Sequence, residues 1–523
     1  MRRLSRELPS SQNGVAWVPD LEIPGADGVV LRADHYVPVT GQPLGTILAR
    51  SPYGRGFPWA HLYGVALAEQ GFHVLLASCR GTGGSAASFA WFRHEAADGQ
   101  AVVAWLRTQD WFDGRLGTIG ASYLGYTQLA LAADGGPPPE LAASVIQVGL
   151  HDPAAFIVPG GALANVVSAV AASFSGQRLA RAVRKLAGLT VRARRSLRVL
   201  PLPAACRRAL AEPAPPTDEW LEHDDPGDPY WDQFRLDLTG WNVPTALQGG
   251  WYDATLDQTL EQYRALRAGG CEVSLLIGPW SHTSAFSRDG LATISRDALT
   301  WLSARLAGAG QARAAVRVWV GGAGQWRDLD GWPPAEATQP WYLAGAGELS
   351  PRAGGTGATS FRYDPADPTP SAGGQLMSPE AGPRDNAAIE ARPDVLVFTS
   401  APLTAALDVL GPVRAELTVR ASAGGAHVFA RLCDVDPGGR SRNVTDGIIR
   451  LRAGQERVTV PMSSTAHQFA PGHRIRLQVS GGAFPRFARN PGTGESPATA
   501  ERLVPTDIEV RHDGTSALLL PAL

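Results

Sequence analysis

Between Val29 and Ser122, short apolar runs alternate with segments in which apolar residues recur at helical spacing. The runs are 46–50, 73–78 and 116–119, and the segments of helical spacing are 59–70 and 94–107. Strands covered by helices on both faces read as short apolar runs. Strands that alternate with helices therefore predict a mostly parallel sheet.

The same alternation resumes after an interruption. A run at 245–249, a helical segment at 255–267 and a run at 273–278 follow one another. Residues 1–145 and 241–312 are therefore predicted to form one α/β domain, with residues 146–240 inserted as a helical cap. Within the insertion, residues 178–208 hold ten Arg or Lys and no acid. We interpret them as the solvated faces of amphipathic helices rather than as a nucleic-acid site.

Past Val316 the pattern changes to strand-like segments separated by Gly, Pro and Asp turns. These segments are 316–320, 395–399, 413–419, 428–432 and 475–479. Many short strands without long helices predict an all-β domain, a sandwich or jelly roll, over residues 313–523.

Composition narrows the class of protein. The 523 residues are 44% hydrophobic and 18% charged, with a net charge of −2, so we expect neither nucleic acid nor membrane as a partner. No apolar stretch is long enough to span a bilayer, and the N-terminus lacks the apolar run of a signal peptide. The four cysteines lie far apart, which argues against a zinc site or a disulfide framework. We expect a soluble, cytoplasmic protein without a metal or cofactor.

The sharpest local feature is Ser122, in the segment Gly120-Ala-Ser-Tyr-Leu-Gly125. A short strand precedes it and a helix follows, which is the context of a nucleophile elbow. The strict elbow has glycine two residues after the serine, whereas Leu124 stands there and glycine follows one position later. The serine is therefore a candidate nucleophile, with an incidental serine in a tight turn as the alternative.

A nucleophilic serine requires a base and a residue that orients the base. Asp253 follows the run that ends in Gly249-Gly-Trp-Tyr, and His282 follows the run that ends in Gly278-Pro-Trp-Ser. In α/β hydrolases the order is Ser, Asp, His, and the carboxyl ends of the strands meet at one edge. We therefore expect these two residues to converge on Ser122.

These motifs resemble the cocaine esterase/X-prolyl dipeptidyl peptidase (CocE/NonD) family of serine hydrolases over essentially the whole chain. The matching stretches are 50–53, 80–81, 120–125, 249–253 and 278–282, and the elbow of the family has Gly-x-Ser-Tyr-x-Gly, as here. The resemblance implies an α/β-hydrolase domain, a helical cap and a C-terminal jelly roll. It implies Ser122 as nucleophile, His282 as base and Asp253 as its partner, with the Tyr53 hydroxyl and the Tyr123 backbone N–H as oxyanion hole.

Two departures from the family concern local chemistry and substrate. Cys79 stands before Arg80-Gly81 where the family commonly has Asp, and we interpret it as a buried thiol rather than a nucleophile. Relatives that cleave amino-acid esters carry acids directly after the triad aspartate, whereas the first acid here is Asp257.

An uncharged ester therefore fits better than an amino-acid ester. The candidate pocket walls are His151, Phe156, Trp251 and Trp280. An X-prolyl peptidase would need a carboxylate for the free N-terminus, for which the cap offers Asp224, Asp225 and Asp228.

The sequence thus predicts a hydrolase that acts on a small-molecule ester or amide through an acyl-enzyme. X-prolyl dipeptidyl-peptidase activity is the first alternative, and an acyltransferase or cyclase that uses the same acyl-enzyme is the second. A carbohydrate-binding protein with an inactive hydrolase domain is the third. A homodimer remains open.

Overall fold

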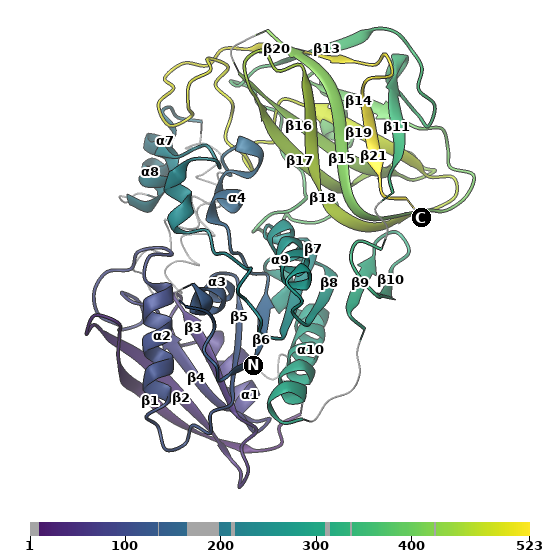
Figure 1. Cartoon of the computed structure of the whole chain (residues 1–523). Helices are drawn as coiled ribbons and strands as arrows, with labels where there is room; N and C mark the ends of the chain where they lie inside the picture. Colours follow the sequence, from purple (N-terminus) through teal and green to yellow (C-terminus); the bar gives the residue numbers. More distant parts are fainter. Residues whose placement is uncertain are drawn as a thin grey trace.

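The computed structural model describes residues 10–133, 135–164, 198–210, 215–308, 314–334, 337–422 and 425–522. Figure 1 shows an α/β domain built from the N-terminal half and an all-β domain built from the C-terminal part, with short helices beside the space where they meet. Most of the basic stretch 178–208 lies outside the described residues.

The α/β domain is built on one ten-stranded sheet with the order β1-β2-β4-β3-β5-β6-β7-β8-β9-β10. Its strands are β1 (Gly14–Pro24), β2 (Val30–Val39), β3 (Thr46–Ser51), β4 (His73–Ser78), β5 (Leu116–Ala121), β6 (Leu141–Gln147), β7 (Thr245–Tyr252), β8 (Val273–Ser281), β9 (Val316–Val320) and β10 (Gln325–Leu329). All neighbours from β4 through β9 are parallel, and the pairs β1–β2, β2–β4 and β9–β10 are antiparallel.

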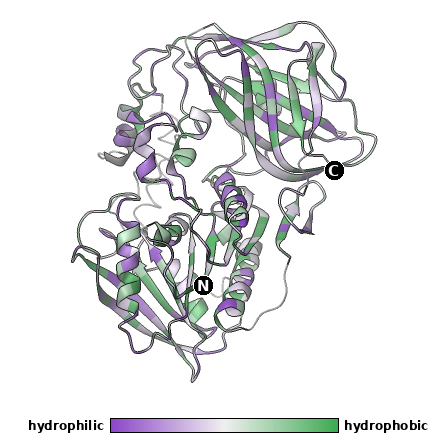
Figure 2. Ribbon diagram, in the orientation of Figure 1, coloured by the Kyte–Doolittle hydropathy of each residue, from purple (hydrophilic) through white to green (hydrophobic). Residues whose placement is uncertain are grey.

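Helices connect and cover these strands, as the alternating pattern predicts. They are η2 (Ala60–Val65), α1 (Ala66–Ala68), α2 (Glu95–Leu106), α3 (Tyr123–Leu129), η3 (Ala130–Ala132), α9 (Leu256–Ala268), η6 (Ser284–Phe286) and α10 (Arg288–Leu306). Every residue of β3, β4 and β5 is buried, which explains why these strands read as continuous apolar runs. Figure 2 shows hydrophobic residues concentrated on the strands of both domains.

The last two strands of this sheet lie past the predicted domain boundary at residue 313. The sequence assigned residues from 313 onward to the all-β domain, but β9 pairs in parallel with β8 and β10 pairs with β9. Val316, Val318 and Val320 are fully buried in the core of the α/β domain. A strand pattern alone does not show which sheet edge a strand will join, so the sequence could not place this boundary.

Between β6 and β7 the chain forms the cap, whose described helices are α4 (Pro153–Ile157), η4 (Pro159–Gly161), α7 (Leu202–Leu210), α8 (Pro215–Glu222) and η5 (Pro229–Gln233). Asp152 caps α4 by accepting from the backbone N–H groups of Ala154 and Ala155. Ion pairs Arg207–Asp218 within the cap and Arg93–Glu219 toward the α/β domain use part of the acidic segment.

Within the described residues 337–422 and 425–522, the β domain contains eleven strands. They are β11 (Gln339–Ala344), β12 (Glu348–Ser350), β13 (Ala358–Tyr363), β14 (Val395–Thr399), β15 (Leu407–Ala421), β16 (Ala426–Val435), β17 (Ser441–Leu451), β18 (Arg457–Phe469), β19 (Arg474–Ser480), β20 (Thr506–Arg511) and β21 (Ala517–Leu520), with η7 (Gly345–Gly347) and α11 (Ala387–Glu390) between them. Nearly all pairs are antiparallel, and their inward residues form one hydrophobic core. The predicted all-β fold is confirmed.

The three parts share a second hydrophobic cluster. It joins Trp91 and Phe92 of the α/β domain, Trp220 of the cap, and Phe429 and Phe487 of the β domain. Burial of aromatic surface is a large source of stability, so this cluster ties the three parts together. No helix in the described ranges is both long and apolar enough to cross a membrane.

Candidate active site

Ser122 lies at the turn between β5 and α3, with a φ of 60° and a ψ of −122°. Left-handed φ values are costly for a residue with a Cβ and persist only where the surroundings hold them. Here the Ser122 N–H donates to the Gln147 carbonyl at 2.8 Å, and the Ser122 carbonyl accepts from Gly125 N–H at 2.8 Å. The turn is therefore a nucleophile elbow in its geometry.

The two glycines of the motif are required by close contacts. A Cβ on Gly120 would lie 2.3 Å from the Leu124 Cβ, and one on Gly125 would lie 2.9 Å from the Gly149 Cα. Leu124 itself is completely buried. The strict pattern has glycine at position 124. In this chain the close contact falls one position later, at Gly125, where α3 passes the segment after β6.

His282 and Asp253 converge on this serine. The Nε2 atom of His282 is 3.0 Å from the Ser122 Oγ, and its Nδ1 atom is 2.8 Å from an Asp253 carboxylate oxygen. Asp253 directly follows β7 and is fully buried, while His282 follows β8 and is 8% exposed. The Thr255 backbone N–H and hydroxyl each donate to Asp253 at 3.0 Å, which fixes the carboxylate.

The Tyr53 phenol lies next to Ser122 and to the Tyr123 backbone. The Tyr53 hydroxyl forms hydrogen bonds with the Ser122 side chain and with the Tyr123 backbone. Burial raises the pKa of Tyr53 to about 12, although these two hydrogen bonds oppose the rise. The phenol therefore stays protonated at neutral pH and keeps its proton for donation.

A buried polar cluster supports the elbow from behind. The Tyr123 hydroxyl donates to Glu95 at 3.0 Å and accepts from the Phe92 backbone N–H at 2.7 Å. The Glu95 carboxylate also receives Arg50 at 2.7 Å, and both charged side chains are almost fully buried. This ion pair could not be identified from the sequence, because the two residues are 45 positions apart and Glu95 stands in no motif.

Cys79 is buried beside the same cluster. Burial, followed by the nearby Glu95 charge, raises the pKa of its thiol well above the usual value. A thiol held in its neutral form is a poor nucleophile, which agrees with the interpretation of Cys79 as a packing residue.

A cavity of about 520 Å³ is lined by residues of the α/β domain, the cap and the β domain, and none of Ser122, Asp253 and His282 is among them. Helix α4 supplies Phe156, helix α9 supplies Asp257 and Leu260, and the β domain supplies Met377 and Met462, among other lining residues. Its volume lies within the usual range for small-molecule sites, roughly 300–1,000 Å³. The sequence analysis missed the walls from the β domain, because no motif marks them.

Of the four predicted pocket walls, only Phe156 lines this cavity. Trp251 donates its indole N–H to the Trp319 carbonyl at 2.6 Å, and Trp280 donates to the Gly249 carbonyl at 2.8 Å. Both indoles are at least 94% buried against neighbouring side chains. His151 is buried too, with Gln262 at 3.4 Å, and burial lowers the pKa of its imidazole.

The three cap acids that could hold a free N-terminus, Asp224, Asp225 and Asp228, already accept hydrogen bonds from other groups of the protein. Asp224 accepts from Arg450 at 3.1 Å and from Ser496 at 2.8 Å, so it joins the cap to the β domain. Asp228 accepts from His223 at 2.8 Å, and Asp225 caps a turn at Gly227. Within the described ranges, no group of three or more His, Cys, Asp or Glu residues is arranged to hold a metal ion.

A serine on a strand-to-helix elbow, with a histidine and a buried aspartate within hydrogen-bonding reach, is the arrangement that serine hydrolases use. The comparisons agree with that class. Residues 27–284 match the X-Pro dipeptidyl-peptidase (S15) family, and residues 308–518 match the X-Pro dipeptidyl-peptidase C-terminal non-catalytic domain. The chain belongs to the cocaine esterase/X-Pro dipeptidyl-peptidase family of serine hydrolases.

The cocaine esterase of Rhodococcus sp. (strain MB1 Bresler) is 32% identical over 90% of this chain and 92% of its own length. An aminopeptidase structure from a marine sediment Thaumarchaeota archaeon has a TM-score of 0.84 at 22% identity and covers 98% of this chain and 97% of its own. An α-amino acid ester hydrolase structure has a TM-score of 0.83 at 20% identity and covers 99% and 98%. The two structures establish the shared fold.

Proposed function

We propose that the chain is a carboxylic ester hydrolase that works through an acyl-enzyme on Ser122. The observation that carries this proposal is the pair of contacts from His282, at 3.0 Å to the Ser122 Oγ and at 2.8 Å to Asp253. The expected cleavage of small-molecule esters rests on the family, whose cocaine esterase member is named for an ester substrate.

In the first half of the reaction, the Ser122 oxygen attacks the ester carbonyl carbon while its proton moves to the His282 Nε2. The tetrahedral intermediate collapses as the same proton passes to the leaving alkoxide, which departs as an alcohol. Water then repeats these steps on the acyl-enzyme and releases the acid. Asp253 accepts the Nδ1–H throughout, so it fixes the tautomer and stabilises the imidazolium.

The oxyanion that develops in both steps needs two donors aimed at one position. We assign the Tyr53 hydroxyl and the Tyr123 backbone N–H to this role, since the Tyr53 hydroxyl interacts with both the Ser122 side chain and the Tyr123 backbone. The Tyr123 N–H also opens α3, so the positive end of that helix faces the oxyanion.

The test compares Ser122→Ala with Cys79→Ala on a p-nitrophenyl ester. We expect Ser122→Ala to lower kcat by about 10⁴-fold or more, with an unchanged circular dichroism spectrum, because the nucleophile is lost. A fluorophosphonate should label the wild type and Cys79→Ala at Ser122 and leave Ser122→Ala unlabelled. Full activity in Ser122→Ala would remove the assignment.

X-prolyl dipeptidyl-peptidase activity is the second candidate, since the matched family carries that description. Against it, the cap acids Asp224 and Asp228 are already paired with Arg450 and His223. Measuring kcat/KM on Xaa-Pro anilides beside aryl esters decides between them, and a clear preference for the anilides would reverse our order. Added alcohols or amines in the ester assay reveal acyl transfer as a new ester or amide product.

A further inference from the structure

The two donors proposed for the oxyanion hole come from segments that are far apart in the sequence. Tyr53 follows β3, and Tyr123 opens α3 two positions after the end of β5. The ladder between these two fully described strands joins residues 46–48 to residues 116–118 and ends there. At the carboxyl ends of the strands, where the donors stand, backbone pairing of β3 with β5 therefore does not fix one donor relative to the other.

Arg50, near the end of β3, supplies contacts that the ladder lacks. Its guanidinium donates to the Glu95 carboxylate at 2.7 Å and to the Glu95 carbonyl at 2.6 Å. The other oxygen of that carboxylate accepts the Tyr123 hydroxyl at 3.0 Å. The Arg50 carbonyl in turn accepts the Thr127 hydroxyl of α3 at 3.3 Å. Buried hydrogen bonds thus join the strand before Tyr53 to the helix that Tyr123 opens.

The pair of Arg50 and Glu95 can act as a fixed support. Both side chains are at most 4% exposed, and a buried ion pair with several hydrogen bonds keeps one geometry because either charge alone would be costly. Gly99 of α2 leaves room for the guanidinium, since a Cβ there would lie 2.6 Å from an Arg50 nitrogen. Burial, followed by the Glu95 charge, raises the pKa of Tyr123 well above its usual value, so the hydroxyl keeps its proton for donation.

The second hydrogen bond of the Tyr123 hydroxyl comes from a residue with a rare backbone conformation. The Phe92 backbone N–H donates to this hydroxyl at 2.7 Å. Phe92 has a φ of 67°, in the left-handed region that a bulky side chain seldom adopts. Such residues persist where their surroundings hold them, and they concentrate at active sites. The phenol is therefore fixed by two contacts, one with a buried carboxylate and one with a strained backbone.

Resting on the proposed esterase function, we propose that the Tyr123 side chain and Glu95 are positioning residues for the oxyanion hole. Tyr123 is 1% exposed and its hydroxyl bonds to protein groups, so the phenol acts on the reaction through the backbone N–H of its own residue. Glu95 and Arg50 hold that N–H in place relative to the Tyr53 hydroxyl. Both donors must point at one atom, and a displacement of about 1 Å can cost about 10²-fold in rate.

The first experiment compares Tyr123→Phe with Tyr126→Phe on a p-nitrophenyl ester. Tyr126 is a matched control because it lies on the same helix, is equally buried and donates its hydroxyl to the Phe234 carbonyl at 3.0 Å. We expect Tyr123→Phe to lower kcat by about 10–100-fold and to change KM less than about threefold, since the hole acts mainly in the transition state. Tyr126→Phe should keep kcat within about threefold of the wild type.

Binding of phenylboronic acid separates positioning from a general loss of packing. Its tetrahedral adduct with the Ser122 oxygen resembles the intermediate, so its affinity, measured by calorimetry, should fall in Tyr123→Phe by about as much as kcat. An unchanged affinity, a rise in KM alone, or equal kcat losses in Tyr123→Phe and Tyr126→Phe would overturn the proposal and leave the esterase function intact. No adduct in the wild type would reject both.

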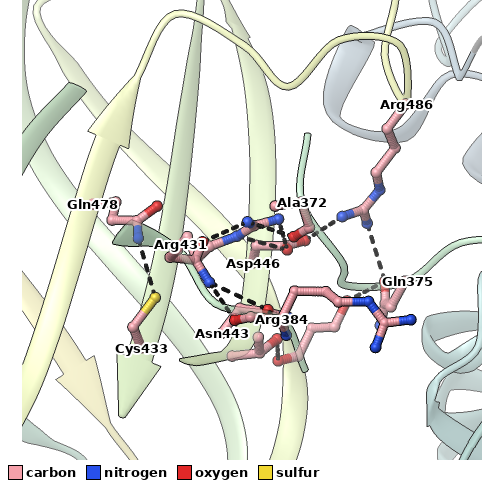
Figure 3. Close-up of polar contacts among 12 residues, drawn as sticks. Ala372, Gln375, Arg384, Arg431, Cys433, Asn443, Asp446, Gln478 and Arg486 are labelled. Atoms are coloured by element: carbon pink, nitrogen blue, oxygen red, sulfur yellow. Dashed lines mark hydrogen bonds and ion pairs between the residues drawn. The ribbon is translucent and has the colours of Figure 1, made fainter. Parts of the chain in front are cut away.

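The second experiment tests the buried ion pair against another one. In the β domain, Arg431 donates to Asp446 at 2.9 Å and to the Ala372 carbonyl at 2.7 Å (Figure 3). Arg50→Lys and Arg431→Lys each keep a positive charge and lose the planar fork that makes several bonds at once.

Both lysine variants should lower the urea midpoint of unfolding, because each weakens a buried network. Only Arg50→Lys should also lower kcat of the folded enzyme, by about tenfold or more. An unchanged kcat in Arg50→Lys, or the same loss in Arg431→Lys, would contradict the proposal.

Discussion

At the scale of single residues, the proposed chemistry depends on side chains held in costly positions. Ser122 keeps a left-handed backbone, and the Tyr53 phenol is buried next to it. Both are held by hydrogen bonds with the backbone around the elbow. Such positions give preorganised donors that need not rearrange when the oxyanion forms.

Replacing Tyr53 with Phe tests this preorganisation. The loss of one oxyanion donor should lower kcat by about 10²–10³-fold with little change in KM, because the donor acts mainly in the transition state. Steady-state kinetics on an aryl ester measures the effect. Tyr63→Phe is the matched control, since that hydroxyl donates to the Gln147 side chain at 2.7 Å rather than to Ser122 or Tyr123. An equal loss in both variants would indicate a general packing effect.

At the scale of elements, strands β2 and β4 carry a buried pair of imidazoles. The His35 Nε2 and the His73 Nδ1 are 2.9 Å apart, and Trp111 stacks on His35 at 3.9 Å. Burial, with the charge of His73 as a smaller cause, lowers the pKa of His35 to about 4, and burial also lowers the pKa of His73. One imidazole donates and the other accepts, so at least the accepting ring is neutral, and burial favours the neutral form of both.

This pair should make stability depend on pH. In the unfolded chain histidine binds a proton near pH 6.5, whereas folded His35 resists it down to about pH 4. The stabilisation is therefore complete above pH 6.5 and is lost as the pH falls toward 4. For His35 alone we expect a loss of about 1–2 kcal/mol between pH 7 and pH 5.

Urea unfolding of the wild type and His35→Gln at the two pH values measures that loss. The variant should show a smaller drop, because glutamine does not titrate. His61→Gln, at an exposed histidine, should behave like the wild type. A drop of the same size in wild type and His35→Gln would contradict the account.

At the scale of the whole molecule, the α/β domain relies on the cap and the β domain to cover part of its apolar surface. The shared cluster places Phe429, Phe484 and Phe487 of the β domain against residues from the other two parts. Hydrogen bonds cross the same boundary, from Arg489 to the Arg198 carbonyl at 2.7 Å and from Ser463 to Asp257 at 2.7 Å. The β domain therefore supplies both stability and the far wall of the cavity.

A chain cut after residue 334, beyond β10, should lose this cover. We expect it to aggregate or to resist fluorophosphonate labelling, since a large apolar surface becomes exposed. Solubility and labelling are compared with the full chain, and Asp224→Ala serves as a milder control that removes only the contacts to Arg450 and Ser496. A soluble, labelled truncated chain would show that the α/β domain is independent.

Local sequence patterns were sufficient to predict most of the order of strands and helices, together with Ser122, Asp253 and His282 as residues that meet. Periodicity and strand length are local properties, so buried runs such as β3, β4 and β5 were predictable. Ser122, Asp253 and His282 could be related in advance because parallel strands bring their carboxyl ends to one edge. The predicted α/β-hydrolase and all-β domains are both present.

Other features of the molecule depend on tertiary contacts and could not be predicted from local patterns. The attachment of β9 to β8, the pairing of Arg50 with Glu95, and the burial of Trp251 within the core depend on contacts between distant segments. The same holds for Asp257, whose neighbours Ser463 and Asp446 come from another domain. No local pattern in the sequence records those surroundings.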